Sequence, residues 1–282
     1  MVLGTSLGPS GTKMSMYRIV RYRGGSFETV EIPVVGEQSL TIFVNGHELA
    51  TLLCTPVKLD YLVLGFLSFE GIIQALDEVQ SLEVFPEEAV ADVRLATAFT
   101  PPRRRILTSG CTGGITFGMP MEGFKAFPEE AVLCPEQPFD LMKQLYAEAY
   151  LYRQSRGIHA AALSDGKSLL LVAEDVGRHN ALDKIHGEAL LQGIPTAGNI
   201  LLSTGRISSE MLRKGAHMRT PFVISRTSPT SLAIAAAKRF GITVIGYCRS
   251  EGFNVYSHPE RVLSQRVTAG SLSHIQQLTA NS

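Results

Sequence analysis

The sequence has little of what staples secreted domains or anchors membrane proteins. Four cysteines occur in 282 residues, and no two of them form a C-x-x-C pair, which argues against a disulfide-stapled secreted domain. No apolar run reaches the roughly 20 residues that a transmembrane helix needs. Residues 1–13 are rich in Gly, Ser and Thr and lack the basic start and apolar core of a signal peptide. We therefore expect a cytoplasmic protein without a membrane partner, and a disordered segment over 1–13.

The sequence also lacks an excess of charge of either sign. Lys and Arg number 26, as do Asp and Glu, so the formal net charge is zero. A general nucleic-acid-binding protein would carry a basic excess, and we expect no nucleic-acid partner. Apolar residues make up 45% and charged residues 18% of the chain, which is typical of a globular protein with a substantial core.

The first part of the chain, residues 14–100, has the pattern of a small α+β unit. Asn45-Gly46 separates two apolar, β-branched runs and is a hairpin signal. Pro101-Pro102, followed by Arg103–Arg105, marks the end of this part. We expect a helix over 56–69 and strands over 29–35, 40–44, 49–53, 81–85 and 91–98.

The second part, residues 101–282, changes to an alternation of strands and helices after His159. This rhythm favours a layered α/β domain with a largely parallel sheet. Ser228 is the expected N-cap of one helix, with Pro229 in its first turn and Gly241 at its end. We expect strands over 159–163, 168–173, 199–203, 221–225 and 242–247, and helices over 139–156, 180–192, 208–217 and 228–240.

Ligands of such sheets gather where strands end and helices begin. Four of the predicted strand ends carry an arginine beside small or hydroxyl residues, which suits a phosphate group: Arg178, Arg206, Arg226 and Arg249. His179 at a helix start and Asp175 at a strand end are further candidate ligands. His159 and His179 have ordinary packing as the alternative. Asp183 and Lys184 fit a surface pair on a helix.

Cys111 lies in the segment Leu107–Gly114 (LTSGCTGG), which is too rich in glycine for a helix or strand. We expect a mobile loop with an uncovered thiol. A sulfur carrier needs such a thiol with a lowered pKa, and Arg103–Arg105 just upstream would help to stabilise the thiolate. The alternative is a small buried side chain. Cys54 and Cys248 fit that alternative better, and Cys134 has no evident role.

Six further segments stand out in order along the chain: Leu64–Ile73 (LGFLSFEGII), Glu174–Lys184 (EDVGRHNALDK), Thr204–Lys214 (TGRISSEMLRK), Ser228–Ala233 (SPTSLA), Gly241–Tyr247 (GITVIGY) and Phe253–Tyr256 (FNVY). Together they resemble the FdhD family of formate dehydrogenase accessory proteins, and the likeness covers residues 30–262. The resemblance implies a cytidine-deaminase-like α/β/α domain with a mixed sheet, preceded by a smaller α+β part, and a homodimer.

The resemblance also implies a sulfurtransferase that serves maturation rather than metabolism. Such proteins accept persulfide sulfur from a cysteine desulfurase and pass it to the molybdenum bis-molybdopterin guanine dinucleotide cofactor of formate dehydrogenase. Cys111 matches the persulfide cysteine, and no metal held by protein side chains is expected. The predicted cofactor-binding residues are those of the matching segment, Tyr247, Cys248, Arg249, Ser250, Glu251 and Gly252, together with Arg178, His179 and Arg206.

This interpretation has three alternatives. The family often carries a second cysteine where this chain has Gly114, so a relay between two loop thiols is impossible and a cofactor-binding chaperone without sulfur transfer stays open. A zinc deaminase needs H-x-E followed by P-C-x-x-C, and only the first half occurs, at His186–Glu188. A Rossmann dehydrogenase needs a G-x-G-x-x-G after a strand, and this sequence contains none.

Overall fold

A computed structural model of the chain describes residues 2–7, 13–101, 106–107, 115–116, 126–127 and 131–262. Cys111 and Arg103–Arg105 lie outside the described residues, so the predictions made for them are not tested by the fold. Two short strands, β8 (Ile106–Leu107) and β9 (Ile115–Thr116), precede and follow Cys111 in the sequence and pair with each other in an antiparallel ladder. Within the described ranges, no helix has the length and apolar character needed to cross a membrane.

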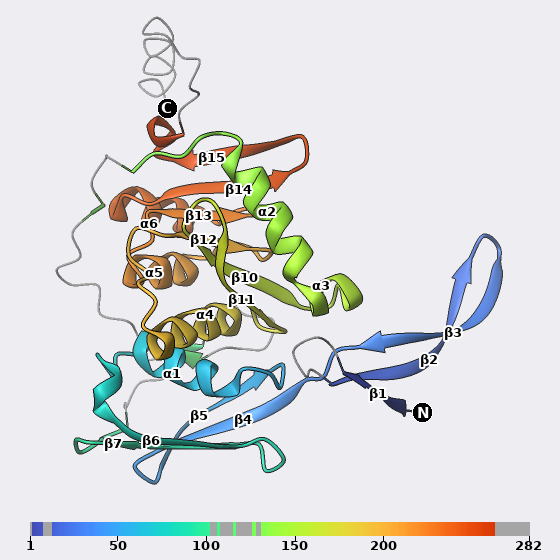
Figure 1. The fold of residues 1–282 in the computed structure, drawn as a ribbon, viewed down its shortest axis with the longest axis horizontal. Coiled ribbons are helices and arrows are strands. Elements are labelled where there is room, and N and C mark those ends of the chain that lie inside the picture. Colours follow the sequence, from blue (N-terminus) through green and yellow to red (C-terminus); the bar gives the residue numbers. More distant parts are fainter. Residues whose placement is uncertain are drawn as a thin grey trace, which may run out of the picture.

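The N-terminal part is an α+β unit with its own hydrophobic core. Its four-stranded sheet has the order β5-β4-β7-β6, with α1 packed against it (Figure 1). Asn45 and Gly46 both have positive φ angles, 49° and 80°, which confirms the predicted hairpin. The elements are β4 (Gln38–Val44), β5 (His47–Cys54), α1 (Leu59–Phe69), the 3-10 turn η1 (Leu76–Glu78), β6 (Val79–Phe85) and β7 (Val90–Leu95).

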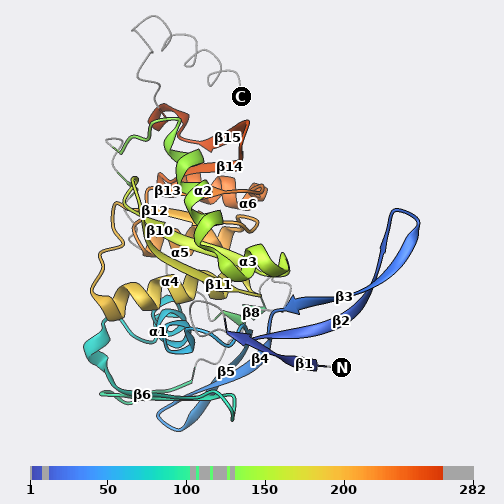
Figure 2. The same ribbon diagram turned by 45° about the vertical axis from the view of Figure 1, so that its right-hand side comes forward.

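A three-stranded antiparallel arm precedes this unit and projects away from the rest of the molecule (Figures 1 and 2). It consists of β1 (Val2–Leu7), β2 (Lys13–Arg23) and β3 (Ser26–Val34). Strand β1 lies within the segment for which the sequence predicts disorder, and it pairs with the first half of β2. The sequence also predicts no strand over β2, whose alternating Arg and apolar residues belong to a ribbon with much of both faces exposed.

The C-terminal part is built on a six-stranded mixed sheet of order β11-β10-β12-β13-β14-β15. Only the β12–β13 and β13–β14 pairings are parallel, so the expectation of a largely parallel sheet was wrong and that of a mixed sheet is confirmed. The reason is that β10–β11 and β14–β15 are antiparallel hairpins. The strands are β10 (His159–Ser164), β11 (Leu169–Asp175), β12 (Ile200–Ser203), β13 (Phe222–Ser225), β14 (Thr243–Arg249) and β15 (Gly252–Ser257).

Helices cover both faces of this sheet and give an α/β/α layering (Figure 1). Successive side chains of a strand point to opposite faces. Leu201 and Val223 therefore join the core beneath α4, α5 and α6, while Leu202 and Ile224 join the core beneath α2. The helices are α2 (Gln137–Glu148), α3 (Tyr150–Ser155), α4 (Arg178–Gln192), α5 (Ser209–His217) and α6 (Ser231–Phe240), and the 3-10 turn η2 (Pro259–Arg261) follows β15.

Two helix boundaries differ from the sequence-based expectation. The single helix expected over 139–156 is broken at Ala149, whose ψ of 84° ends α2 before α3 begins. Thr230 rather than Ser228 caps α6, because the Thr230 hydroxyl accepts the N–H of Ala233. Gly241 ends α6 with a φ of 66°, as predicted.

Two glycines join the N-terminal and C-terminal parts. A Cβ atom on Gly65 of α1 would lie 1.8 Å from the carbonyl oxygen of Asp183, and one on Gly187 of α4 would lie 1.9 Å from that of Tyr61. Helices α1 and α4 thus touch backbone to backbone, which only residues without a side chain permit. This crossing places α4 between the two cores and fixes one end of the sheet.

Candidate functional site

The predicted strand-end residues lie along one edge of the six-stranded sheet. Strands β11, β12, β13 and β14 run in the same direction, and β10 runs against them. His159 at the start of β10 therefore pairs with Asp175 at the end of β11, and Ser203 at the end of β12 pairs with Ser225 at the end of β13. This register brings the ends of β11, β12, β13 and β14 to the same edge, where the sequence predicts four arginines.

A pocket of about 480 Å³ opens at this edge, between α2 and the ends of β13 and β14. Its size lies within the roughly 300–1,000 Å³ of small-molecule sites. Three of the predicted cofactor-binding residues, and the strand-end arginine Arg226, line it. The full lining is Phe139, Asp140, Met142, Lys143, Tyr146, Arg226, Cys248, Arg249 and Ser250.

Charged side chains of the pocket are left without partners inside the described part of the chain. Asp140, Lys143 and Arg226 make no side-chain hydrogen bond or ion pair there. The guanidinium carbon of Arg249 lies 5.8 Å from the centroid of the Tyr247 ring. The pocket therefore offers both a carboxylate and several cations to a bound molecule.

An unusual backbone turn sets the direction of the side chains at the end of β14. Tyr247 has a positive φ of 51°, and its N–H donates to the carbonyl of Thr227 at 3.0 Å. Tyr247 points outward and is 43% exposed, whereas Cys248 is 2% exposed and turns inward. Burial raises the pKa of the Cys248 thiol to about 11, so this side chain lines the pocket as a neutral thiol.

The remaining residues of the predicted segment lie at the β14–β15 turn. Glu251 and Gly252 are exposed, and Gly252 pairs with Arg249 across the turn. Tyr247, Glu251 and Gly252 do not line the pocket. The structure thus places half of the segment in the pocket wall and half on the neighbouring surface.

Arg178, His179 and Arg206 form a second group on the same edge, nearer β10 and β12, and none of them lines the pocket. His179 lies within 3.2 Å of the Ser208 hydroxyl, and burial lowers its pKa to about 2, so the imidazole is neutral. Arg178 is buried, whereas Arg206 is exposed. The group is thus a packed corner with two arginines and a neutral imidazole, and its role in cofactor binding stays a prediction.

Gly205 lies between the corner of Arg178, His179 and Arg206 and the end of β13 beside the pocket. A Cβ atom on Gly205 would lie 3.0 Å from Nδ1 of His159 and 3.1 Å from Cβ of Arg178, so a larger residue would crowd both. The Ser225 hydroxyl donates to the Gly205 carbonyl at 2.6 Å. The end of β12 is in this way held against the end of β13, next to the pocket.

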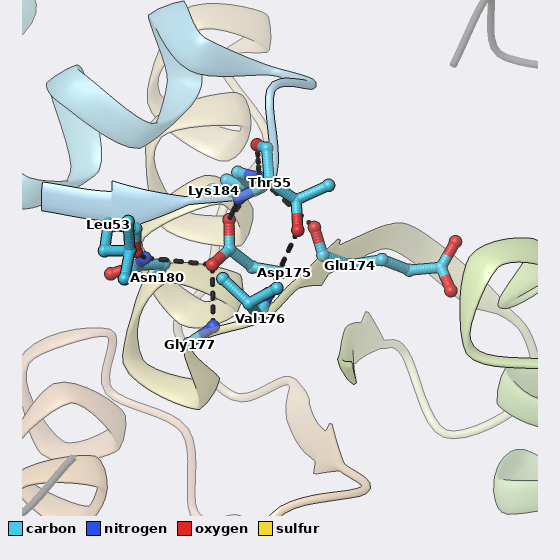
Figure 3. Close-up of polar contacts among 8 residues, drawn as sticks. All are labelled: Leu53, Thr55, Glu174, Asp175, Val176, Gly177, Asn180 and Lys184. Atoms are coloured by element: carbon cyan, nitrogen blue, oxygen red, sulfur yellow. Dashed lines mark hydrogen bonds and ion pairs between the residues drawn. The ribbon is translucent and has the colours of Figure 1, made fainter. Parts of the chain in front are cut away.

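Asp175 is a structural residue and not a free ligand, which corrects its interpretation as a candidate (Figure 3). Its Oδ2 lies 2.6 Å from Nζ of Lys184 and accepts the N–H of Thr55 at 3.0 Å. Its Oδ1 accepts from the N–H of Gly177 at 2.7 Å and from the Asn180 amide at 2.9 Å. Both side chains of the ion pair are completely buried, and the network ties β5 and its following loop to α4.

The expected surface pair of Asp183 and Lys184 is also wrong, because both side chains are buried in separate ion pairs. Asp183 pairs with Lys214 of α5, and Lys184 pairs with Asp175. A helix that is buried on most of its circumference carries no surface pair. The segment 174–184 therefore holds the molecule together more than it displays functional groups.

The H-x-E residues of the zinc-deaminase alternative, His186 and Glu188, lie in the contact between α1 and α4. The His186 ring lies 3.0 Å from the Ser68 hydroxyl, and Glu188 pairs with Lys58 at 2.5 Å. Among the described residues, no three His, Cys, Asp or Glu side chains are grouped so that they could hold a metal ion. These side chains serve the contact between α1 and α4.

Sequence reasoning missed the α2 side of the pocket. Phe139, Asp140, Met142, Lys143 and Tyr146 come from a helix that precedes the first strand of the sheet by more than ten residues. The available signal was the exposed, polar positions Asp140 and Lys143, spaced three apart on a helix whose opposite face is apolar. No strand-end rule points to such a helix.

Comparisons with known proteins agree with this architecture. The model of the FdhD/NarQ family matches residues 35–263. The sulfur carrier proteins FdhD of Staphylococcus aureus strains MRSA252 and Newman are each 37% identical over 251 residues, which cover 87% of this chain and 95% of theirs. A crystal structure assigned as a formate dehydrogenase accessory protein of Desulfotalea psychrophila superposes with a TM-score of 0.72 at 29% identity, covering 89% of this chain and 99% of that one. The chain belongs to the FdhD/NarQ family.

Proposed function

We propose that this protein is a cytoplasmic sulfur carrier for the maturation of formate dehydrogenase. It accepts sulfur from a cysteine desulfurase on Cys111 and passes it to the molybdenum bis-molybdopterin guanine dinucleotide cofactor, which is its substrate. Its similarity to a sulfur carrier protein and to a formate dehydrogenase accessory protein supports the general role. The desulfurase, the dehydrogenase and a second copy of the chain are the proposed partners.

The observation that carries the proposal is the pocket at the strand ends. Arg226, Arg249 and Ser250 supply two guanidinium groups and a hydroxyl, which suit the phosphates of a nucleotide. The neighbouring corner of Arg178 and Arg206 extends the positive charge along the same edge. A cofactor with two nucleotide ends needs an extended site of this kind.

The sulfur-accepting step needs one thiolate and no external oxidant or reductant. The Cys111 thiolate attacks the outer sulfur of the desulfurase persulfide, a new S–S bond forms on Cys111, and the desulfurase cysteine leaves as its thiolate. The outer sulfur moves with its proton, so atoms and charge balance. Strands β8 and β9 pair just before and after residues 108–114, so the chain enters and leaves this segment at one place.

Two of the other cysteines are poor nucleophiles by their surroundings. Burial raises the pKa of the Cys54 thiol to about 12 and that of Cys248 to about 11. Both stay protonated at neutral pH, and the thiolate is the reactive form. We expect iodoacetamide at pH 8 to leave both unmodified in the folded protein, as read by peptide mass mapping. Rapid alkylation of either would remove this support for Cys111.

The proposal is tested by mass spectrometry after incubation with a cysteine desulfurase and cysteine. We expect a gain of one sulfur atom on the peptide that contains Cys111, removable by a reductant, and none in Cys111→Ala. The matched control is Cys134→Ala, which should gain sulfur as the parent does. Sulfur found on another cysteine, or on none, would refute transfer through Cys111.

Gly114 favours one alternative, a chaperone that binds the cofactor and moves no sulfur, because a relay between two loop thiols is impossible here. Complementation of a strain that lacks its own accessory protein separates the two functions. Full formate dehydrogenase activity with Cys111→Ala would support the chaperone. Loss of activity, with the variant still soluble and still able to bind guanosine diphosphate, would support sulfur transfer.

A further inference from the structure

We propose that Asp140 and Lys143 of α2 read the guanine base of the bound nucleotide. This inference rests on the proposed nucleotide-binding function of the pocket and assigns its base-specific side. The two residues stand one helical turn apart, and both are exposed in the pocket wall. Neither side chain has a hydrogen-bonding or ionic partner in the described part of the protein, and they do not pair with each other.

The chemistry of the pair matches one base better than the others. Guanine presents two adjacent donors, N1–H and the exocyclic N2 amino group, beside two acceptors, O6 and N7. The Asp140 carboxylate only accepts hydrogen bonds, and the Lys143 ammonium only donates them. Adenine places an acceptor, N1, where guanine has a donor, so it would bring a lone pair against the carboxylate. The sign of the discrimination therefore favours guanine over adenine.

The other pocket residues favour a position of the base next to α2. Arg226, Arg249 and Ser250 come from the strand ends, and their guanidinium and hydroxyl groups suit phosphate oxygens. On the α2 side the charges of Asp140 and Lys143 cancel, so the two arginines at the strand ends attract the phosphates more strongly than α2 does. A nucleotide is thus oriented with its phosphates toward the ends of β13 and β14 and its base toward α2.

Aromatic side chains of α2 complete the base site, and both are held in place. The Tyr146 ring has the Arg156 guanidinium carbon 5.2 Å from its centroid, and its hydroxyl accepts a hydrogen bond from the same arginine. The Phe139 ring packs on Phe253 with centroids 5.3 Å apart. Flat apolar surfaces of this kind suit the face of a purine, while Asp140 and Lys143 meet its edge.

The inference is tested by calorimetric titration of the full-length protein with GDP, ADP and xanthosine diphosphate. A hydrogen bond to a charged group is worth about 1.5–3 kcal/mol, so Asp140→Asn should lose roughly 10- to 100-fold in GDP affinity while ADP binding stays as weak as before. The asparagine amide can donate to the O2 of xanthine, so this variant should gain affinity for xanthosine diphosphate. Lys143→Met should also weaken GDP more than ADP.

The matched control is Glu148→Gln, a charge change on the same helix outside the pocket lining, which should bind all three nucleotides as the parent does. Equal GDP affinity in the parent and in Asp140→Asn would overturn the inference and leave the nucleotide pocket standing. Equal loss for GDP and ADP would also overturn it, because the residue would then act on the phosphates or the fold. Failure of the parent to bind GDP at all would refute the proposed pocket itself.

Discussion

Replacement of Lys184 by methionine is the sharpest test of the reassigned role of segment 174–184. The Lys184 ammonium pairs with Asp175 at 2.6 Å and also donates to the carbonyls of Thr55 and Glu174 at 3.0 and 3.2 Å. Neither side chain of the pair is reached by solvent. Methionine keeps the length and volume of the side chain but leaves the Asp175 carboxylate without its counter-charge.

The size of the effect follows from that uncompensated charge. Removing one partner of a buried ion pair costs about 3–5 kcal/mol, which is a large share of the 5–15 kcal/mol that stabilises a typical protein. The N–H groups of Thr55 and Gly177 and the Asn180 amide still solvate the carboxylate. We therefore expect the lower half of this range, about 3–4 kcal/mol.

The assay is urea unfolding at pH 7 followed by far-UV circular dichroism, since the sequence contains no tryptophan to report by fluorescence. The control is Arg18→Met, which breaks the exposed pair with Glu31 on the arm and should cost at most about 1 kcal/mol. The double variant Asp175→Asn with Lys184→Met should recover part of the loss, because no buried charge remains. An unchanged unfolding free energy in Lys184→Met, with a loss of ligand binding, would restore Asp175 as a ligand.

Three further predictions concern single packing features. Gly187→Ala should destabilise by about 3 kcal/mol or more or abolish soluble expression, because its Cβ would overlap a backbone carbonyl, whereas Gly36→Ala finds ordinary contact distances and should be neutral in the same urea assay. Burial lowers the pKa of His186 to about 3, so its contribution to stability is present above pH 6.5 and is lost as the pH falls toward 3. In His186→Gln the unfolding free energy should therefore fall less steeply with decreasing pH, and the change in slope corresponds to at most one proton taken up on unfolding. Thr230→Ala should cost about 1 kcal/mol of unfolding free energy, and Ser228→Ala almost nothing; the opposite ranking would mean that α6 begins earlier than observed.

The strand and helix positions were largely predictable because hydrophobic periodicity is a local property. The hairpin depends on the dipeptide Asn45-Gly46, and the end of α6 depends on Gly241, so both can be predicted from one or two residues with positive φ. Pairing direction was less accessible. Strand β10 pairs with β12 in the antiparallel direction. That direction depends on the path of the chain between the two strands, and it cannot be predicted from the residues of either strand.

The candidate site was predictable only where it follows the strand-end rule. Arg226 and Arg249 come to one edge because parallel strands end together. The α2 wall was missed because Asp140 is more than 80 residues from Arg226 in sequence and joins it only through the packing of α2 on the sheet. The burial of Asp175 was missed for the same reason, since its partner Thr55 comes from the N-terminal part.

These two errors have a common physical origin that bears on how the protein works. A carboxylate beside this edge of the sheet, whether it comes from a strand end or from a helix, can face solvent, where it is free to bind a ligand, or a second structural unit, where it becomes part of the joint. Asp175 faces the joint, because α1 and β5 cover this end of the sheet, and Asp140 faces solvent, because nothing in the described residues covers α2 there. The exposed carboxylate therefore lies at the opposite end of the edge from the N-terminal part. If this division holds, substitutions at Asp175 change stability and leave nucleotide preference intact, while substitutions at Asp140 do the reverse.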